Sequence, residues 1–275
     1  MTTALALVSS LMWGGSDFIA GRLAGRLPVL SVVAGSQVFG LLLTLVLATA
    51  TGSWGEPLSY LPWAALAAAS GAAGLALFYS ALAAGKMGVV APIASAGVLV
   101  PFFVGVAVGQ LPSVGQLVGV LAAFVGLIMA TGPELSGFAS RRTVIMAAIA
   151  AALFGTCLTA IAGGSQTSAV MTMTTMRIMI VATLLTVGVI LRTRGGLTRQ
   201  DVPLLVVIGT LDVGANLSYG IATTHGELAI SAVLASLYPV VTMMLAWRIL
   251  HERLRTVQYL GVAAVLAGVA LIAVM

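Results

Sequence analysis

The sequence predicts an all-α, polytopic membrane protein: a bundle of ten transmembrane helices built as two inverted five-helix repeats. Composition is the first observation behind this prediction, because 60% of the 275 residues are apolar and only 7% are charged, against roughly 25% charged in a soluble domain. The second observation is that the apolar residues form runs of about 20, the length that crosses a bilayer as a helix. The third is that the two halves of the chain match one another in order.

The same composition excludes several classes of protein. So few charged residues cannot cover a soluble surface, so we expect neither a soluble enzyme nor a secreted or disordered protein. One cysteine, Cys157, and two distant histidines, His225 and His251, offer no disulfide framework and no metal site. The basic residues lie between the apolar runs, so the net charge of +5 does not indicate nucleic-acid binding. The sequence holds no phosphate-binding or nucleophile motif, and we expect no cofactor and no enzyme activity.

Breaks rich in glycine and proline separate the predicted spans. They are clearest at 52–57, 132–134 and 163–165. The first apolar run follows a start without basic residues, so we interpret it as a retained helix and not as a signal peptide. The expected spans are 3–20, 29–51, 61–83, 89–109, 113–132, 143–163, 168–191, 202–222, 228–249 and 256–275.

Five-helix repeats are predicted at 1–135 and 143–275, because an offset of about 140 residues aligns the two halves. The aligned pairs are Trp13 with Phe154, Gln37 with Arg177, Tyr79 with Tyr219, and Pro101 with Pro239. A repeat with five spans is odd-numbered, so the second copy must enter the membrane from the opposite side. This inverted architecture is common among secondary transporters.

Positive charge is distributed unevenly over the loops, which predicts the orientation of the chain. Cytoplasmic loops collect Lys and Arg, and here every basic residue outside the spans falls at an odd-numbered loop. Both termini are therefore expected on the outer side of the membrane. The residues concerned are Arg22, Arg26, Lys86, Arg141, Arg142, Arg192, Arg194, Arg199, Arg248, Arg253 and Arg255.

Two ionisable residues, Arg177 and Asp212, lie near the middle of predicted spans. A charge at that depth costs ~2.5–3.5 kcal/mol on insertion, so the two side chains are expected to pair. The pair either faces a cavity, where it binds a charged substrate group or relays a proton, or it is a structural ion pair that locks two helices. Asp212, Asn216 and Tyr219 follow one another at i, i+4 and i+7, which predicts one polar stripe on their helix.

Aromatic residues are candidates for the wall of the same cavity. We expect Trp13, Tyr79 and Tyr238 to line it. Asp17 lies closer to the cytoplasmic end of the first span, and there we expect a salt bridge with Arg22 at the membrane interface.

Three prolines, Pro92, Pro101 and Pro239, interrupt two of the spans. Proline removes a backbone hydrogen bond and allows a kink. Paired interruptions at matched repeat positions mark a hinge or a binding site in inverted-repeat transporters. A static kink that serves packing is an equal alternative.

A set of short motifs runs through both halves in a fixed order. It comprises Leu11 to Phe18, Tyr79 to Leu82, Ala229 to Leu237, Tyr238-Pro239, His251 to Leu254, Gln258 to Gly261, and Gly268. Taken together, these motifs resemble the EamA branch of the drug/metabolite transporter superfamily. The first half is the less typical copy, since Gln110 stands where a glutamate matching Glu252 is expected, and Gln37 where an arginine like Arg177 is common. The resemblance implies ten helices, a central cavity between the repeats and movement of small metabolites.

The resulting hypothesis is a secondary transporter, an exporter of small polar or amphipathic metabolites such as amino acids, working by alternating access. Its expected partners are a small-molecule substrate, the lipid bilayer and, if the ion pair relays one, a coupled proton. Its expected location is a bacterial-type cytoplasmic membrane, which it would cross many times. A membrane channel and an intramembrane enzyme are the alternatives that the sequence leaves open.

Overall fold

The computed structural model describes residues 1–84, 90, 93–94, 96–130, 140–190, 196–251 and 255–274. Within these residues all regular elements are helices, as the sequence predicted, and no strand is found. The helices are α1 (Thr2–Ala24), α2 (Val29–Ala50), α3 (Leu61–Ala84), α5 (Leu99–Ala107), α6 (Val114–Ala130), α7 (Arg141–Ile190), α8 (Val202–His225), α9 (Leu228–Ala235), α10 (Tyr238–Leu250) and α11 (Thr256–Val274), with 3-10 turns at Ser53–Gly55, Leu58–Tyr60 and Ala96–Val98.

The described helices are suited to a membrane by length and composition. Six helical segments of the described chain are long and apolar enough to cross a bilayer. Three further apolar helices are shorter, at Ala96–Ala107, Val114–Ala130 and Thr256–Ile272. The predicted span 89–109 is only partly described, so its first turns cannot be compared with the prediction.

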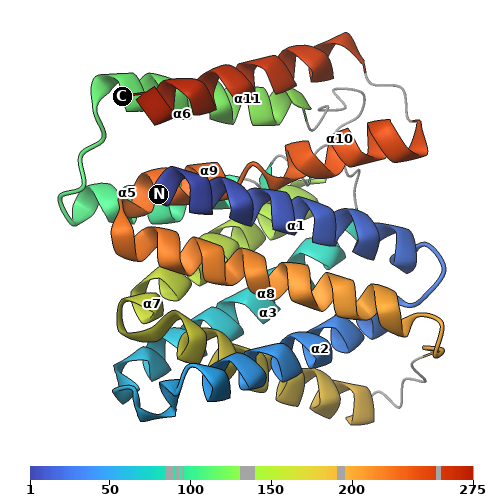
Figure 1. Cartoon of the computed structure of the whole chain (residues 1–275). Helices are drawn as coiled ribbons and strands as arrows, with labels where there is room; N and C mark the ends of the chain where they lie inside the picture. Colours follow the sequence, from blue (N-terminus) through green and yellow to red (C-terminus); the bar gives the residue numbers. More distant parts are fainter. Residues whose placement is uncertain are drawn as a thin grey trace.

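The helices run side by side, and both chain termini lie at the same end of the bundle (Figure 1). The turns at 25–28 and 196–201 lie at the opposite end, which we call the basic end. There Arg26 forms an ion pair with Asp201, with 3.3 Å between Nη2 and Oδ1. Hydrogen bonds from the hydroxyl and the N–H of Thr198, and then the charge of Arg26, hold the pKa of Asp201 below its ordinary value.

The predicted break at 163–165 is wrong by a few residues. Helical structure continues through it, and the one non-helical residue inside α7 is Ser168, with φ −159° and ψ 111°. Gly163 and Gly164 serve close packing instead, because a Cβ at Gly163 would lie 2.7 Å from the ring of Trp63. The Ser168 hydroxyl accepts the N–H of Met171 at 3.3 Å and caps the second segment of α7, residues 169–190.

The predicted span 228–249 is two helices, α9 and α10. The break falls at Ser236 and Leu237, and Pro239 occupies the first turn of α10. Proline is tolerated there because its missing N–H would be unpaired in any case. The matched Pro101 occupies an equivalent place, the first turn of α5, after a 3-10 turn. Pro92 lies outside the described residues.

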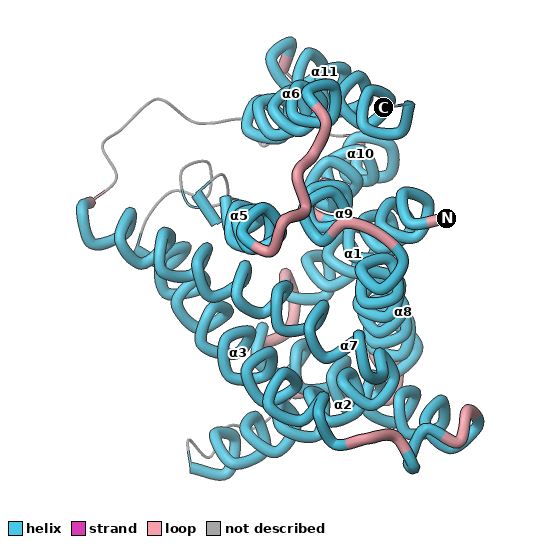
Figure 2. Tube along the Cα trace, turned by 90° about the vertical axis from the view of Figure 1, so that its left-hand side faces the viewer, coloured by secondary structure: helices cyan, strands magenta, loops and turns pink. Residues whose placement is uncertain are grey.

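Glycines allow α6 and α11 to pack as a close pair at one side of the bundle (Figure 2). A Cβ at Gly119 would lie 2.8 Å from the carbonyl oxygen of Gly268, and one at Gly126 would lie 2.7 Å from that of Gly261. In lipid, where hydrophobicity does not drive association, such close backbone contact is a main source of helix attraction.

Two further helix pairs, together with α2, form the part of the bundle that holds the ion pair of Arg177 and Asp212. α3 packs along α7, and α1 packs along α8. α2 contacts both α7 and α8, so it lies where the two pairs meet. This arrangement brings side chains from α1, α2, α7 and α8 to one place.

Candidate functional site: an ion pair among amides and aromatic rings

The ion pair that the sequence predicted between Arg177 and Asp212 is present. Nη2 of Arg177 lies 2.7 Å from Oδ2 of Asp212, and the two side chains are 2% and 23% exposed. α7 and α8 are packed against one another, and each contributes one member of the pair from the middle of a helical segment. Opposite charges at this separation largely offset each other's desolvation cost.

Gln37 on α2 completes the pairing, and sequence reasoning did not select it. Its side-chain oxygen accepts a hydrogen bond from Nη1 of Arg177, and its amide nitrogen donates to Oδ2 of Asp212 at 3.5 Å. A signal for it was present, because Gln37 and Arg177 are matched positions of the two repeats. Matched positions meet wherever equivalent helices pack together, as α2 and α7 do here.

Asn216 and Trp13 hold the other oxygen of Asp212. The Asn216 amide donates to Oδ1 at 3.0 Å and to the backbone oxygen of Asp212 at 2.7 Å. The indole N–H of Trp13, on α1, donates to the same Oδ1 at 3.2 Å. Asp212 is therefore a carboxylate with donors on both oxygens, and these hydrogen bonds fix its position.

Two tyrosines pack on either side of Trp13. The ring centroids are 6.1 Å apart for Trp13 and Tyr219, and 6.0 Å apart, edge to face, for Trp13 and Tyr238. Tyr219 is completely buried and its hydroxyl has no hydrogen-bond partner in the described part of the chain. Six of the predicted site residues thus gather in one place: Trp13, Arg177, Asp212, Asn216, Tyr219 and Tyr238.

Tyr79 belongs to α3, but its side chain lies outside the described part of the structure. The prolines stand apart from the polar group. Pro101 is buried in α5 and Pro239 begins α10, next to Tyr238. A role of either proline as a hinge stays a prediction.

The predicted salt bridge between Asp17 and Arg22 is wrong. The guanidinium carbon of Arg22 lies 5.9 Å from the centroid of the Phe18 ring, four residues before it on the same face of α1. Residues five apart on a helix point in directions about 140° apart, so Asp17 faces away from Arg22. Asp17 instead interacts electrostatically with Asp212.

Exposure of the site increases toward the basic end of the bundle. Tyr219 is 0% exposed and Asn216 6%, whereas Asp212 is partly accessible and Asp17 is exposed. α8 begins at the basic end and α1 finishes there, so these residues are ordered by their distance from that end.

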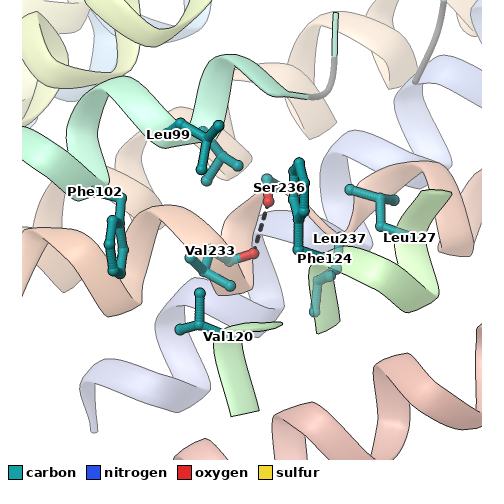
Figure 3. Close-up of a pocket in the computed structure, with 9 residues that line it drawn as sticks. Leu99, Phe102, Val120, Phe124, Leu127, Val233, Ser236 and Leu237 are labelled. Atoms are coloured by element: carbon teal, nitrogen blue, oxygen red, sulfur yellow. Dashed lines mark hydrogen bonds between the residues drawn. The ribbon is translucent and has the colours of Figure 1, made fainter. Parts of the chain in front are cut away.

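An apolar cavity of about 40 Å³ lies apart from the ion pair, between α5, α6 and α9 (Figure 3). Its wall contains Val98, Leu99, Phe102, Val120, Phe124, Leu127, Val233, Ser236 and Leu237. The one hydroxyl among them, that of Ser236, donates to the backbone oxygen of Val233 at 2.8 Å and is satisfied. This cavity includes none of the predicted site residues and offers no charged group to a polar solute.

The described residues contain no group of three or more His, Cys, Asp and Glu side chains that could hold a metal ion. The groups that the described residues present at the site are a carboxylate, amide groups and ring faces, all of which can bind a small solute.

The sequence model of the EamA-like transporter family matches residues 1–132 and again residues 141–274. One solved structure, described only as "Crystal structure of protein", superposes with a TM-score of 0.82 at 16% identity, over 98% of this chain and 95% of the other. At that identity the likeness concerns the fold alone. Comparison with curated proteins finds none that matches. Because the family model covers nearly the whole chain in two copies, this multi-pass membrane protein belongs to the EamA-like transporter family.

Proposed function

We propose that the protein is a secondary transporter of the cytoplasmic membrane, which exports small polar or amphipathic metabolites by alternating access through a central cavity between its repeats. The observation that carries this proposal is the ion pair of Arg177 and Asp212, held by Gln37 and Trp13. Helices of both family repeats contribute to it. A polar site at the meeting of two repeats is where inverted-repeat transporters bind their substrates.

Reciprocal contacts support ten spans in two inverted repeats, with boundaries at 1–135 and 143–275. A Cβ on Gly14 would meet Tyr238 and Val241, and a Cβ on Gly155 would meet Gly97 and Val100. The two contacts are equivalent across the repeats. Adding 141 to Gly14 gives Gly155, and subtracting 141 from Tyr238 and Val241 gives Gly97 and Val100. A two-fold relation between the repeats interchanges contacts in this way.

The contacts between the matched helices α6 and α11 are reciprocal in the same way. Gly119 meets Gly268 and Gly126 meets Gly261, and because Gly119 matches Gly261 and Gly126 matches Gly268, each contact maps onto the other. Gln37 and Arg177, also matched, hydrogen-bond one another. The proposed site therefore lies on the axis about which the repeats would exchange conformations.

Counterflow into proteoliposomes tests the function. The purified protein is loaded with one unlabelled solute and offered a panel of labelled amino acids, amines and other small metabolites. Saturable uptake that requires solute on the inside supports a transporter. Uptake that rises linearly with concentration supports a channel, and recovery of a chemically altered solute supports an intramembrane enzyme.

Asn216→Ala is expected to weaken transport without loss of folding. The substitution removes two hydrogen bonds that position Asp212, and a bond to a charged group contributes about 1.5–3 kcal/mol. We expect the half-saturation concentration in counterflow to rise about tenfold or more. Gln166→Ala is the matched control, because Gln166 joins α7 to the backbone of Thr223 at 3.2 Å, outside the site. Unchanged saturation kinetics in Asn216→Ala would count against the stripe as a substrate site.

The orientation of the chain is expected to put both termini outside the cell. The described basic residues Arg26, Arg141, Arg199 and Arg255 all fall at odd-numbered connections, which are expected to be cytoplasmic. A reporter that is active only outside should work when fused to the C-terminus and fail when inserted at 196–200. A cytoplasmic C-terminus would reverse the assignment while leaving the repeats intact.

A further inference from the structure

Asp17 is a carboxylate within a membrane-spanning helix, and it has no partner among the residues that the structure describes. Among the described residues it forms neither an ion pair nor a hydrogen bond. Its side chain is exposed, although it lies seven residues before the end of α1 at Ala24, about 10 Å along the helix. A carboxylate at this depth is costly unless something compensates it.

The surroundings of Asp17 place it beside the site already described. It interacts electrostatically with Asp212 on α8 and with Tyr238 on α10, so it faces the space between these helices. Trp13 lies one turn earlier on the same face of α1. The Trp13 and Tyr238 rings meet edge to face there. The Tyr238 hydroxyl makes no hydrogen bond with any described residue.

Charge in the site does not balance. With both carboxylates ionised, Asp17 and Asp212 carry two negative charges, and among the described residues Arg177 carries the one positive charge beside them. The other cation on α1, Arg22, lies over Phe18 and away from the site. One net negative charge is left in a low-dielectric region, and one monovalent cation would balance it.

A substrate carboxylate is poorly served in this site. Arg177 is 2% exposed and is already bound to Asp212 and Gln37, which leaves its buried Nε as a donor without a hydrogen-bond partner among the described residues. An entering anion would also be repelled by Asp212 and, when it is ionised, by Asp17. A protonated amine meets the opposite conditions, because Asp17 and the Tyr238 hydroxyl can accept its N–H groups. The faces of Trp13 and Tyr238 would add cation–π attraction.

We propose that Asp17, Trp13 and Tyr238 form a subsite for the ammonium group of a small organic amine, so that the substrates are monovalent amine cations and not free amino acids. This inference rests on the proposed transport function and narrows its substrate class. Deeper in the site, the buried and unpaired hydroxyl of Tyr219 gives the body of the amine a polar group to contact.

Binding to the purified full-length protein in nanodiscs, measured by titration calorimetry, tests the inference. The probes are alanine amide, leucine amide and phenylalanine amide, each compared with its free amino acid, in which a carboxylate replaces the neutral carboxamide. We expect at least one amide to bind about tenfold or more tightly than its acid. Equal binding of amides and acids, or no binding by any amide, would overturn the proposal.

Variants identify the subsite. Asp17→Asn should weaken amide binding about tenfold or more, and Tyr238→Phe, which keeps the ring, should weaken it to a smaller extent. Glu56→Gln is the control, because Glu56 is an exposed carboxylate in the connection between α2 and α3. Unchanged amide binding in Asp17→Asn overturns the assignment. Thermal unfolding of each variant shows whether it is folded, and if Asp17→Asn is not, the result for Tyr238→Phe decides.

Failure of this inference is distinguishable from failure of the proposed function. Saturable counterflow of amino acids or neutral solutes without amide binding would reject the amine subsite and keep the transporter. Amide binding that depends on Asp17, without counterflow of any solute, would keep the subsite and reject the transporter.

Discussion

Replacing Arg177 by methionine is expected to destabilise the protein more than replacing Arg177 and Asp212 together. The single variant leaves Asp212 as a carboxylate without its counter-charge, held in place by Trp13 and Asn216. Breaking one partner of a buried pair costs about 3–5 kcal/mol, whereas replacing both by neutral groups of similar shape is often neutral. Arg177→Met and Asp212→Asn should each lower the yield of folded protein, and the double variant should recover it.

Transport by the same variants separates structure from mechanism. Recovery of yield without recovery of counterflow means that the pair also takes part in the transport cycle. Recovery of both means that the pair only holds α7 against α8. Purely additive effects on thermal unfolding in the double-mutant cycle would contradict a direct contact between the two residues.

Gly261→Ala is the second change with a large expected effect. The added methyl group would overlap the backbone of α6 at Ala130 and Gly126, and backbone atoms cannot move aside as a flexible side chain can. The helices α6 and α11 would have to separate, which we expect to cost about 3 kcal/mol, the upper part of the range for overpacking. A fall in the midpoint of thermal unfolding in detergent measures it.

Gly21→Ala is the matched control. A Cβ at Gly21 would meet no atom within 4 Å, and Gly21 is also in a helix, α1. Alanine should stabilise that helix slightly, by roughly 0.5–1 kcal/mol. If Gly261→Ala were as well tolerated as Gly21→Ala, the close pairing of α6 and α11 would be wrong.

The helical class and the central ion pair could be predicted because the bilayer gives the sequence few choices. Long apolar runs can satisfy their backbone groups only as helices. Two isolated opposite charges within the bilayer are each costly alone, so pairing lowers the free energy of both. The helical bounds mostly fall within a few residues of those expected, as for α2 at Val29–Ala50. The proposed functions of the site residues stay predictions.

The exact ends of helices were less predictable, because a glycine can either end a helix or allow a neighbouring side chain to pack closely against it. The two roles look alike in a sequence. Gly163 and Gly164 were expected to end a span, but they instead make room for Trp63 and Thr172. The actual interruption, Ser168, is an ordinary polar residue whose capping role depends on where the chain turns. Only the packing partner distinguishes the two uses.

The pairing of polar residues was harder to predict, because it depends on how each helix is rotated about its own axis. Asp17 was paired with Arg22 on proximity along the chain, whereas Phe18 shares the face of Arg22. Gln37 was noticed only as a departure from an expected arginine, and its neutral amide can bridge two charges that a second arginine would unbalance. A comparison of matched positions across the repeat would have found this contact.

The corner at Ser168 has a mechanical consequence. One non-helical residue joins the two segments of α7, and a single residue spans at most about 3.6 Å. The adjoining helix ends therefore cannot move apart, although their far ends can change angle. The connection between α2 and α3, residues 51–60, is long enough to permit sliding. At the end of the bundle that holds the termini, the two segments of α7 should therefore change their angle about Ser168. The longer connection between α2 and α3 would then accommodate the accompanying change in the distance between those two helices.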